Sequence, residues 1–244
     1  MAGIAAFFAR ESVPDFNVII RPMIDSYITG PKHDVDCVMY NTNTGHYHAW
    51  DQNEVESFGE DRYKEFRTIY QDTFRPESVL LFGIDLKVQQ VSFDGTNDKI
   101  HSDSIFMLNH SSNKFTIGSQ EETAYYLANV YRQHRDMKRT LECQIETDIN
   151  ILALDTKKKF IYSANDGHQG LQMCHAYIKG IGFMLHENMV CLRNIIHDVT
   201  ACSEDAVNLW ETWYGHPLES EVIRETDLIS GNMRKIKFNP KYSY

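Results

Sequence analysis

Apolar and polar residues alternate along much of the chain with the period of two that is typical of β-strands. The clearest case is residues 141–151, where apolar side chains at every second position are separated by polar ones. Such a strand has one buried and one solvated face. Residues 35–40 and 46–50 predict two further strands, because the segment 41–45 between them holds the Asn and Gly of a tight turn.

Other apolar runs predict the remaining strands. Gly180 and Gly182 interrupt one run that continues through residues 190–196, which indicates strands with a bend or bulge. The other strands are expected within residues 79–93, 105–108, 114–117 and 160–163.

Apolar residues spaced three or four positions apart predict helices. Residues 58–73 follow a capping box of Ser57 with Glu60, and a second box of Ser119 with Glu122 opens another helix. In each box the Ser side chain accepts a hydrogen bond from the helix, and the Glu returns one to the Ser backbone.

The two ends of the chain each add one expected helix. Near the carboxyl end, Ser203 is placed to cap a helix that carries Trp210, Trp213 and Tyr214 on its apolar side. Residues 1–14 are a possible N-terminal helical arm, either docked on a neighbouring molecule or packed back on its own core.

Strands joined by short turns, with few helices between them, indicate antiparallel pairing. We therefore expect a mainly-β fold with helices, an antiparallel β-sandwich flanked by three or four α-helices. A length of 244 residues suits one large domain, and neither a repeat nor a linker divides it, so residues 1–244 are predicted to form a single domain.

Charge and cysteine content narrow the partners and the compartment. A net charge of −10 argues against nucleic acid and anionic membranes as partners, and the basic run 157–159 is expected at a solvated hairpin tip. The start of the chain lacks the layout of a signal peptide. Free thiols and a cytoplasmic location follow from cysteines that are odd in number and form no close pair: Cys37, Cys143, Cys174, Cys191 and Cys202.

Histidines are the first candidates for chemistry. His46 and His48 lie two apart on a predicted strand, so they share a face as metal-binding pairs do. His168 and His175 flank a Gly-rich segment, with Asp166 nearby. The spacing supplies no third ligand, and solvent-facing histidines are the alternative, so no metal site is predicted.

His197, Asp198 and Cys202 are residue types used in nucleophilic catalysis, although helix capping by Ser203 explains the same segment. The chain contains none of the specific motifs of phosphate loops, serine hydrolases, zinc peptidases or calcium loops. We therefore predict no enzyme, no catalytic residue and no required cofactor, and the cofactor-binding residues are unknown. The competing class is a metal-dependent hydrolase with a His/carboxylate cluster.

Two segments resemble the polyhedrins of cypoviruses, which form crystals inside infected insect cells. The first is a strand, a Gly turn, a strand and an aromatic helix, and the second leads into the aromatic segment near the carboxyl end. The residues that carry the resemblance are Val38, Tyr40, Gly45, Asn53, Phe58 and 63–67 in the first segment, and 197–199, Ser203, Asp205, Trp210, Tyr214, Leu218 and Glu219 in the second.

This resemblance implies a β-sandwich with flanking helices, trimers packed into a lattice and an N-terminal helix between molecules. The function it implies is that of a structural protein that self-assembles into crystalline viral occlusion bodies embedding virions in the host cell cytoplasm. Such crystals hold at neutral pH and dissolve at alkaline pH, where Tyr, Cys and Lys titrate. The expected partners are copies of the chain and virus particles, with bound nucleotide as a possibility known in that family.

Overall fold

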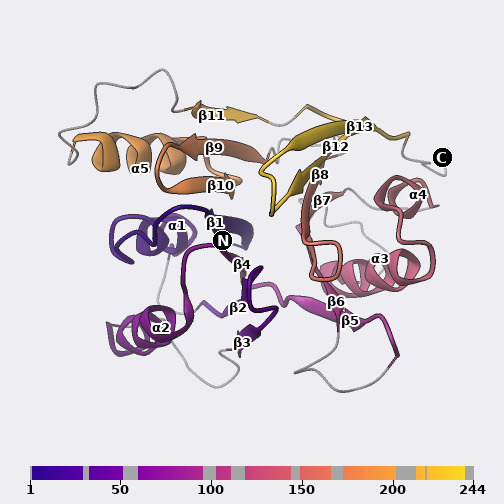
Figure 1. The fold of residues 1–244 in the computed structure, drawn as a ribbon, viewed down its shortest axis with the longest axis horizontal. Coiled ribbons are helices and arrows are strands. Elements are labelled where there is room, and N and C mark those ends of the chain that lie inside the picture. The colour runs from indigo at the N-terminus through magenta and orange to yellow at the C-terminus, as the bar shows by residue number, and fades with distance from the viewer. Residues whose placement is uncertain are drawn as a thin grey trace. The chain divides into compact units, whose positions relative to one another are not determined.

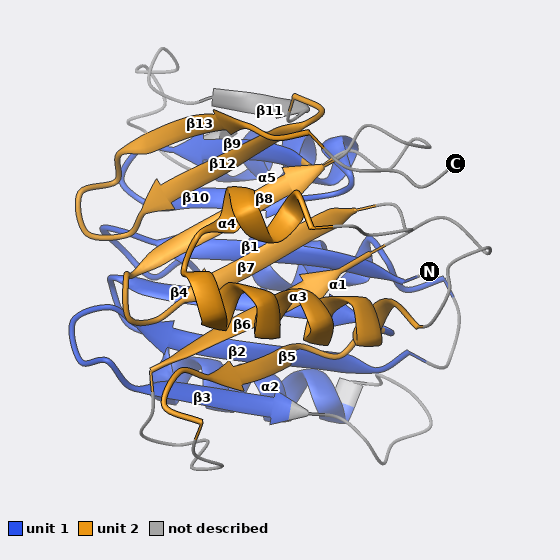
Figure 2. Ribbon diagram, turned by 90° about the vertical axis from the view of Figure 1, so that its right-hand side faces the viewer, with its two compact units in different colours: residues 1–85, 174–217 blue, residues 86–173, 218–244 orange. Residues whose placement is uncertain are grey.

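The computed structural model describes residues 2–29, 33–51, 60–95, 103–110, 119–143, 149–165, 173–201, 213–217 and 219–239. Contacts divide the chain into two compact units, each built from two separate stretches of sequence (Figure 2). Unit 1 comprises Met1–Asp85 with Cys174–Pro217, and unit 2 comprises Leu86–Met173 with Leu218–Tyr244. Whether residues 1–244 act as a single domain stays a prediction.

Unit 1 is an antiparallel sheet of seven strands with three helices (Figure 1). The strand order is β11-β9-β10-β1-β4-β2-β3, which places β1 in the centre. The strands are β1 (Gly3–Ala9), β2 (Val35–Asn41), β3 (Tyr47–Asp51), β4 (Ser78–Ile84), β9 (Cys174–Ile178), β10 (Gly182–His186) and β11 (Trp213–Pro217), and the helices are α1 (Ile20–Asp25), α2 (Glu60–Thr73) and α5 (Met189–Ala201).

The helices of unit 1 pack on one face of its sheet. Alternate residues of β1, namely Ala5, Phe7 and Ala9, belong to the same apolar cluster as the buried faces of α1, α2 and α5. Alternation places these three side chains on one face of the strand. The other residues of β1 are buried as well, so the whole strand lies in the interior.

Unit 2 is an antiparallel sheet of six strands, with α3 and α4 packed on one face (Figure 2). Its strand order is β13-β12-β8-β7-β6-β5. The elements are β5 (Gln89–Ser92), β6 (Ser104–Asn109), α3 (Gln120–His134), α4 (Met137–Leu141), β7 (Asn150–Asp155), β8 (Phe160–Asn165), β12 (Val222–Asp227) and β13 (Met233–Lys237).

The predicted fold class is confirmed: the chain consists mainly of antiparallel strands flanked by helices, five of them in the described residues. The hairpin of β2 and β3 and the helix α2 lie where the sequence predicts them. The capping box of Ser119 and Glu122 forms at the start of α3, whereas Ser57 lies outside the described residues. No helix in the described part of the chain is long and apolar enough to cross a membrane.

The prediction of a helical arm at residues 1–14 is wrong. Residues Gly3–Ala9 form β1, which pairs with β10 on one side and β4 on the other. A short apolar run is compatible with either a helix or a central strand, and periodicity alone does not separate the two. Pairing on both sides, which depends on distant segments, makes it a strand.

The strand expected at residues 141–151 is also wrong over its first part. Met137–Leu141 form α4, which Asp136 caps by accepting a hydrogen bond from the Arg139 amide. The strand β7 begins only at Asn150, and residues 144–148 lie outside the described chain. All six residues of β7 are buried, so this strand does not show the alternation of buried and exposed residues on which the prediction rested.

Two further elements near the carboxyl end differ from expectation. Residues 190–196 lie in α5, where the Asn188 side chain accepts hydrogen bonds from the amides of Val190 and Cys191. Trp213 and Tyr214, expected on a helix, lie in β11, which pairs with β9 through a register shift. Ser203 and Trp210 of that expected helix lie outside the described residues.

Candidate functional site

Polar side chains gather at the amino end of β1, where its neighbour β10 ends. The last residue of β10, His186, lies opposite Ala5. At Ile4, side chains bind the backbone in place of a neighbouring strand: Glu187 Oε2 accepts from the amide at 3.0 Å, and the Tyr27 hydroxyl donates to the carbonyl at 2.9 Å. The end of this central strand is therefore closed by two side chains from distant segments.

Tyr27 fills the space beside Gly3. A Cβ atom added at Gly3 would lie 2.0 Å from Cε1 of the tyrosine ring, so only glycine fits at this position. The other contact of the ring is with His186, which stacks on it with 4.6 Å between the ring centroids and 17° between the planes. Tyr27 is thus held between the strand and the histidine.

His186 is a neutral imidazole with both nitrogens engaged. Its side chain is fully buried, and burial lowers the pKa of His186 to about 4. Nδ1 accepts a hydrogen bond from the Asn188 amide at 2.8 Å, which assigns the proton to Nε2. Nε2 lies 3.0 Å from both the Met23 carbonyl oxygen and Ser26 Oγ. Neither ring nitrogen of His186 is therefore free to accept a proton.

The hydroxyl and thiol groups around His186 are also poor nucleophiles. Ser26 Oγ donates to Met23 O at 2.8 Å, and Cys191 Sγ lies 3.4 Å from Pro22 O. Burial raises the pKa of the Cys191 thiol to about 11 and that of Tyr27 well above its usual value. Nucleophilic and basic residue types meet here, but each is held in its neutral, hydrogen-bonded form.

The histidines that the sequence singled out do not form a metal site in the described structure. His48 lies in β3 and His46 in the turn before it; both are exposed and line a surface cavity of about 550 Å³. His175 is buried in β9, while His168 and Asp166 lie outside the described residues. Among the side chains that are described, no three metal-ligating residues come together.

His197 and Asp198 are neighbours on the solvent side of α5. The imidazole Nδ1 lies 3.4 Å from Asp198 Oδ1, and the two side chains are 82% and 68% exposed. Cys202, the third residue of that candidate group, lies outside the described residues. The two described members form a solvated contact within one helix.

The basic run and the cysteines lie as expected where they are described. Residues 157–159 form the turn between β7 and β8, in which Lys158 Nζ donates to the Arg135 carbonyl oxygen at 2.5 Å. Cys202 is outside the described residues, and the other four cysteines are free thiols: Cys37, Cys143, Cys174 and Cys191.

No known sequence family and no curated protein matches the chain. Solved structures do: a glutamine phosphoribosylpyrophosphate amidotransferase from B. subtilis, complexed with ADP and GMP, is similar with a TM-score of 0.58 and 11% identity. A structure described as the allosteric regulatory enzyme of purine biosynthesis has a TM-score of 0.57 and 10% identity. Both comparisons cover 99% of this chain and 50% of the other, so the chain spans about half the length of these proteins.

A glutamine aminotransferase class-II domain protein from Silicibacter pomeroyi is also similar, with a TM-score of 0.48 and 8% identity over 98% of this chain and 100% of that one. At identities near 10% these likenesses concern the fold alone. The chain therefore shares its fold with part of the B. subtilis amidotransferase and of the purine-biosynthesis enzyme.

The resemblance to polyhedrins is wrong, and the occlusion-body function falls with it. The fold follows amidotransferase domains over nearly the whole chain. The resemblance rested partly on an aromatic helix through Tyr214, and that residue lies in a strand. A Gly turn and an aromatic helix are common motifs that many folds share. Self-association, virus particles and nucleotide as partners are untested.

Proposed function

We propose that this chain is a non-catalytic domain with an Ntn-hydrolase-like fold, whose role is to bind a ligand or partner without turning it over. The observation that carries this proposal is the state of His186. A general base needs a free nitrogen lone pair and a pKa near the working pH. His186 uses Nδ1 to accept a backbone amide, and its pKa is lowered to about 4.

The residues of β1 support the same proposal. Ntn hydrolases are named for an N-terminal nucleophile, a role that requires a Cys, Ser or Thr side chain. Here β1, Gly3–Ala9, contains none of these residue types. The Tyr27 ring fills the space beside Gly3, the first residue of β1.

The similar structures include an amidotransferase that uses glutamine, so release of ammonia from glutamine is the activity to test. Ammonia can be measured with a coupled glutamate dehydrogenase assay on the purified chain. We expect no release above the rate in buffer. Ala2→Cys supplies a thiol just before β1, and we expect this variant to stay inactive because the Tyr27 ring fills the space beside Gly3.

Turnover of glutamine by the unchanged chain would overturn the proposal. Circular dichroism and thermal unfolding of both proteins are the controls, because inactivity is informative only if the fold is retained. The hydrolase alternative has its own test: stoichiometric zinc or manganese in purified protein, lost on His46→Ala, would favour it. A cytoplasmic location, proposed from the free thiols, agrees with a binding role but does not depend on it.

A further inference from the structure

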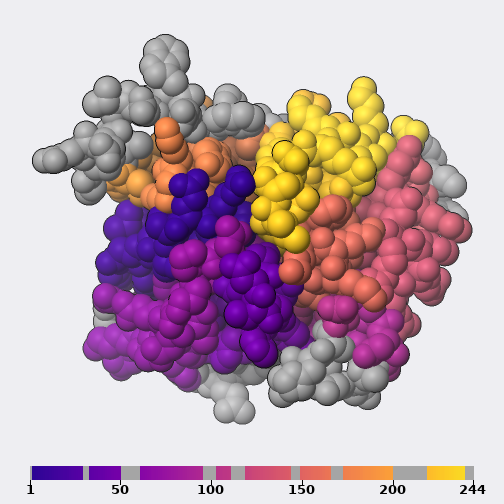
Figure 3. All heavy atoms as spheres, in the orientation of Figure 1, coloured from indigo at the N-terminus to yellow at the C-terminus, as the bar shows by residue number. Residues whose placement is uncertain are grey.

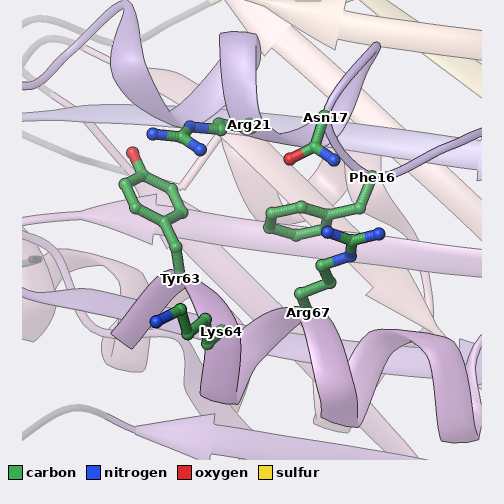
Figure 4. A pocket seen from close by; sticks show the side chains of 6 residues that line it. All are labelled: Phe16, Asn17, Arg21, Tyr63, Lys64 and Arg67. Carbon is green, nitrogen blue, oxygen red and sulfur yellow. The ribbon is translucent and has the colours of Figure 1, made fainter. Parts of the chain in front are cut away.

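A cavity lies between α1 and α2 in unit 1, on the helix-covered side of its sheet. Its volume is about 340 Å³, near the lower end of the roughly 300–1,000 Å³ typical of small-molecule sites. Of the six described residues that line it, three are cationic and none is acidic (Figure 4). They are Phe16, Asn17 and Arg21 from the α1 side and Tyr63, Lys64 and Arg67 from α2.

Aromatic packing fixes the two walls of this cavity relative to each other. Phe16, which precedes α1, is 2% exposed and packs against three rings of α2. Its centroid lies 6.5 Å from that of Tyr63 and 5.6 Å from those of Phe66 and Tyr70. Figure 3 shows the segments of α1 (indigo) and α2 (purple) side by side at the surface. The cavity is therefore formed by packed elements.

Arg21 is held in position on the cavity wall. Its guanidinium carbon lies 4.5 Å from the centroid of the Tyr63 ring, and its Nε lies 3.5 Å from the Asp25 carboxylate one turn along α1. The Tyr63 hydroxyl donates to the same carboxylate. A guanidinium oriented before a ligand arrives loses less entropy on binding it.

The other two cations of the cavity are weakly neutralised. Lys64 lies 3.7 Å from Asp61, but those side chains are 70% and 100% exposed, so the pair adds little. Arg67 makes no ion pair with any described residue, whereas Arg62 on the same helix pairs with Glu65. An exposed arginine alone is ordinary. Three cations around one cavity repel one another, and an anion would relieve that repulsion.

We propose that this cavity binds the phosphate group of a small phosphorylated molecule. A guanidinium matches a phosphate with two parallel hydrogen bonds, Lys64 adds a third charge, and the Asn17 amide can donate to a remaining oxygen. A phosphate dianion neutralises this cluster better than a single carboxylate does. The net charge of −10 disfavours long polyanions, which would meet repulsion beyond the cavity.

Isothermal titration calorimetry at constant ionic strength tests the proposal, with inorganic phosphate and glycerol 3-phosphate as probes. Both should give saturable heat. Arg67→Gln should weaken binding about tenfold, because it removes one charge-assisted contact. Arg62→Gln is the matched control on α2: it also removes one positive charge from the helix but lies outside the cavity lining, so binding should change less than about twofold.

The absence of saturable heat with both probes would overturn the proposal. If Arg67→Gln and Arg62→Gln weakened phosphate binding equally, the effect would be one of general charge and the proposal would be wrong. Tighter binding of citrate than of phosphate would show that the cavity binds carboxylates instead of phosphate. Capture by anionic phospholipid vesicles, with no binding of the soluble probes, would exclude a small molecule. None of these results bears on glutamine hydrolysis, so this proposal and the proposed function fail independently.

Discussion

The amino end of β1 and the cavity between α1 and α2 use similar polar groups in opposite ways. At the strand end, Tyr27 and His186 are buried and their polar atoms bind the backbone. In the cavity, Lys64 and Arg67 are exposed and little neutralised by the described residues. Buried polar atoms must form their hydrogen bonds within the protein. An exposed charge is hydrated by water, so it needs no partner in the protein and stays available to a ligand. Catalytic residue types alone therefore do not mark a site.

The largest effect that separates the two regions should be the pH dependence of stability at His186. The folded state lowers the pKa of His186 from its usual value near 6.5 to about 4. Between pH 6.5 and pH 4 the unfolded state binds more protons than the folded state. The contribution of His186 to the unfolding free energy is therefore fully present above about pH 6.5 and is lost as the pH is lowered. The loss should reach about 3 kcal/mol at pH 4. Urea unfolding of the unchanged chain against His186→Gln measures it.

The comparison with His186→Gln removes contributions from carboxylates that titrate in the same range. His197→Gln is the control for a histidine in solvent, since its side chain is 82% exposed, and this variant should keep the pH dependence of the unchanged chain. A slope that survives His186→Gln would show that the strand end is open to water, which would remove the contrast with the cavity.

The next effect should come from Gly3→Ala, which tests how tightly Tyr27 closes the strand end. The added Cβ would lie 2.0 Å from the ring, so the ring or the strand must move. We expect a loss of about 2 kcal/mol in unfolding free energy, as for an overpacked core, measured by urea unfolding at neutral pH. An unchanged stability would mean that Tyr27 moves freely and that the strand end can open.

Local signals predicted much of the fold and little of either site. The turn at Gly45 and the box of Ser119 and Glu122 act within a few residues, so the sequence shows them directly. The strand β1 was missed because its partners lie far along the chain. Tyr27 and His186 are separated by 159 positions, so no short sequence motif predicts their contact.

The cavity was missed for a different reason. Its cations lie on two helices, and the apolar spacing that predicts a helix at residues 58–73 gives Arg67 no particular role. An exposed arginine is ordinary in any sequence. Arg67 is notable because Arg21 lines the same cavity. The packing of Phe16 on α2 brings these two arginines to that cavity. Periodicity can assign a residue to a face but cannot pair that face with another.

The smallest effect is the sharpest comparison, because it changes the same atom in both regions. Tyr27→Phe and Tyr63→Phe each remove one hydroxyl and keep the ring. The Tyr27 hydroxyl donates to Ile4 O in the interior, and its loss leaves that buried carbonyl without this donor, at a cost of about 1.5 kcal/mol. The Tyr63 hydroxyl donates to Asp25, a carboxylate that is 48% exposed and that water can satisfy, so its loss should cost about 0.5 kcal/mol.

Urea unfolding at neutral pH measures both losses, and phosphate titration of the same proteins completes the test. Tyr63→Phe should weaken phosphate binding slightly, because Arg21 keeps its ring contact but loses part of its orientation through Asp25. Tyr27→Phe should leave phosphate binding unchanged. Equal losses of stability in the two variants would mean that burial does not distinguish the two regions. The contrast between a closed strand end and a cavity that binds anions would then be wrong.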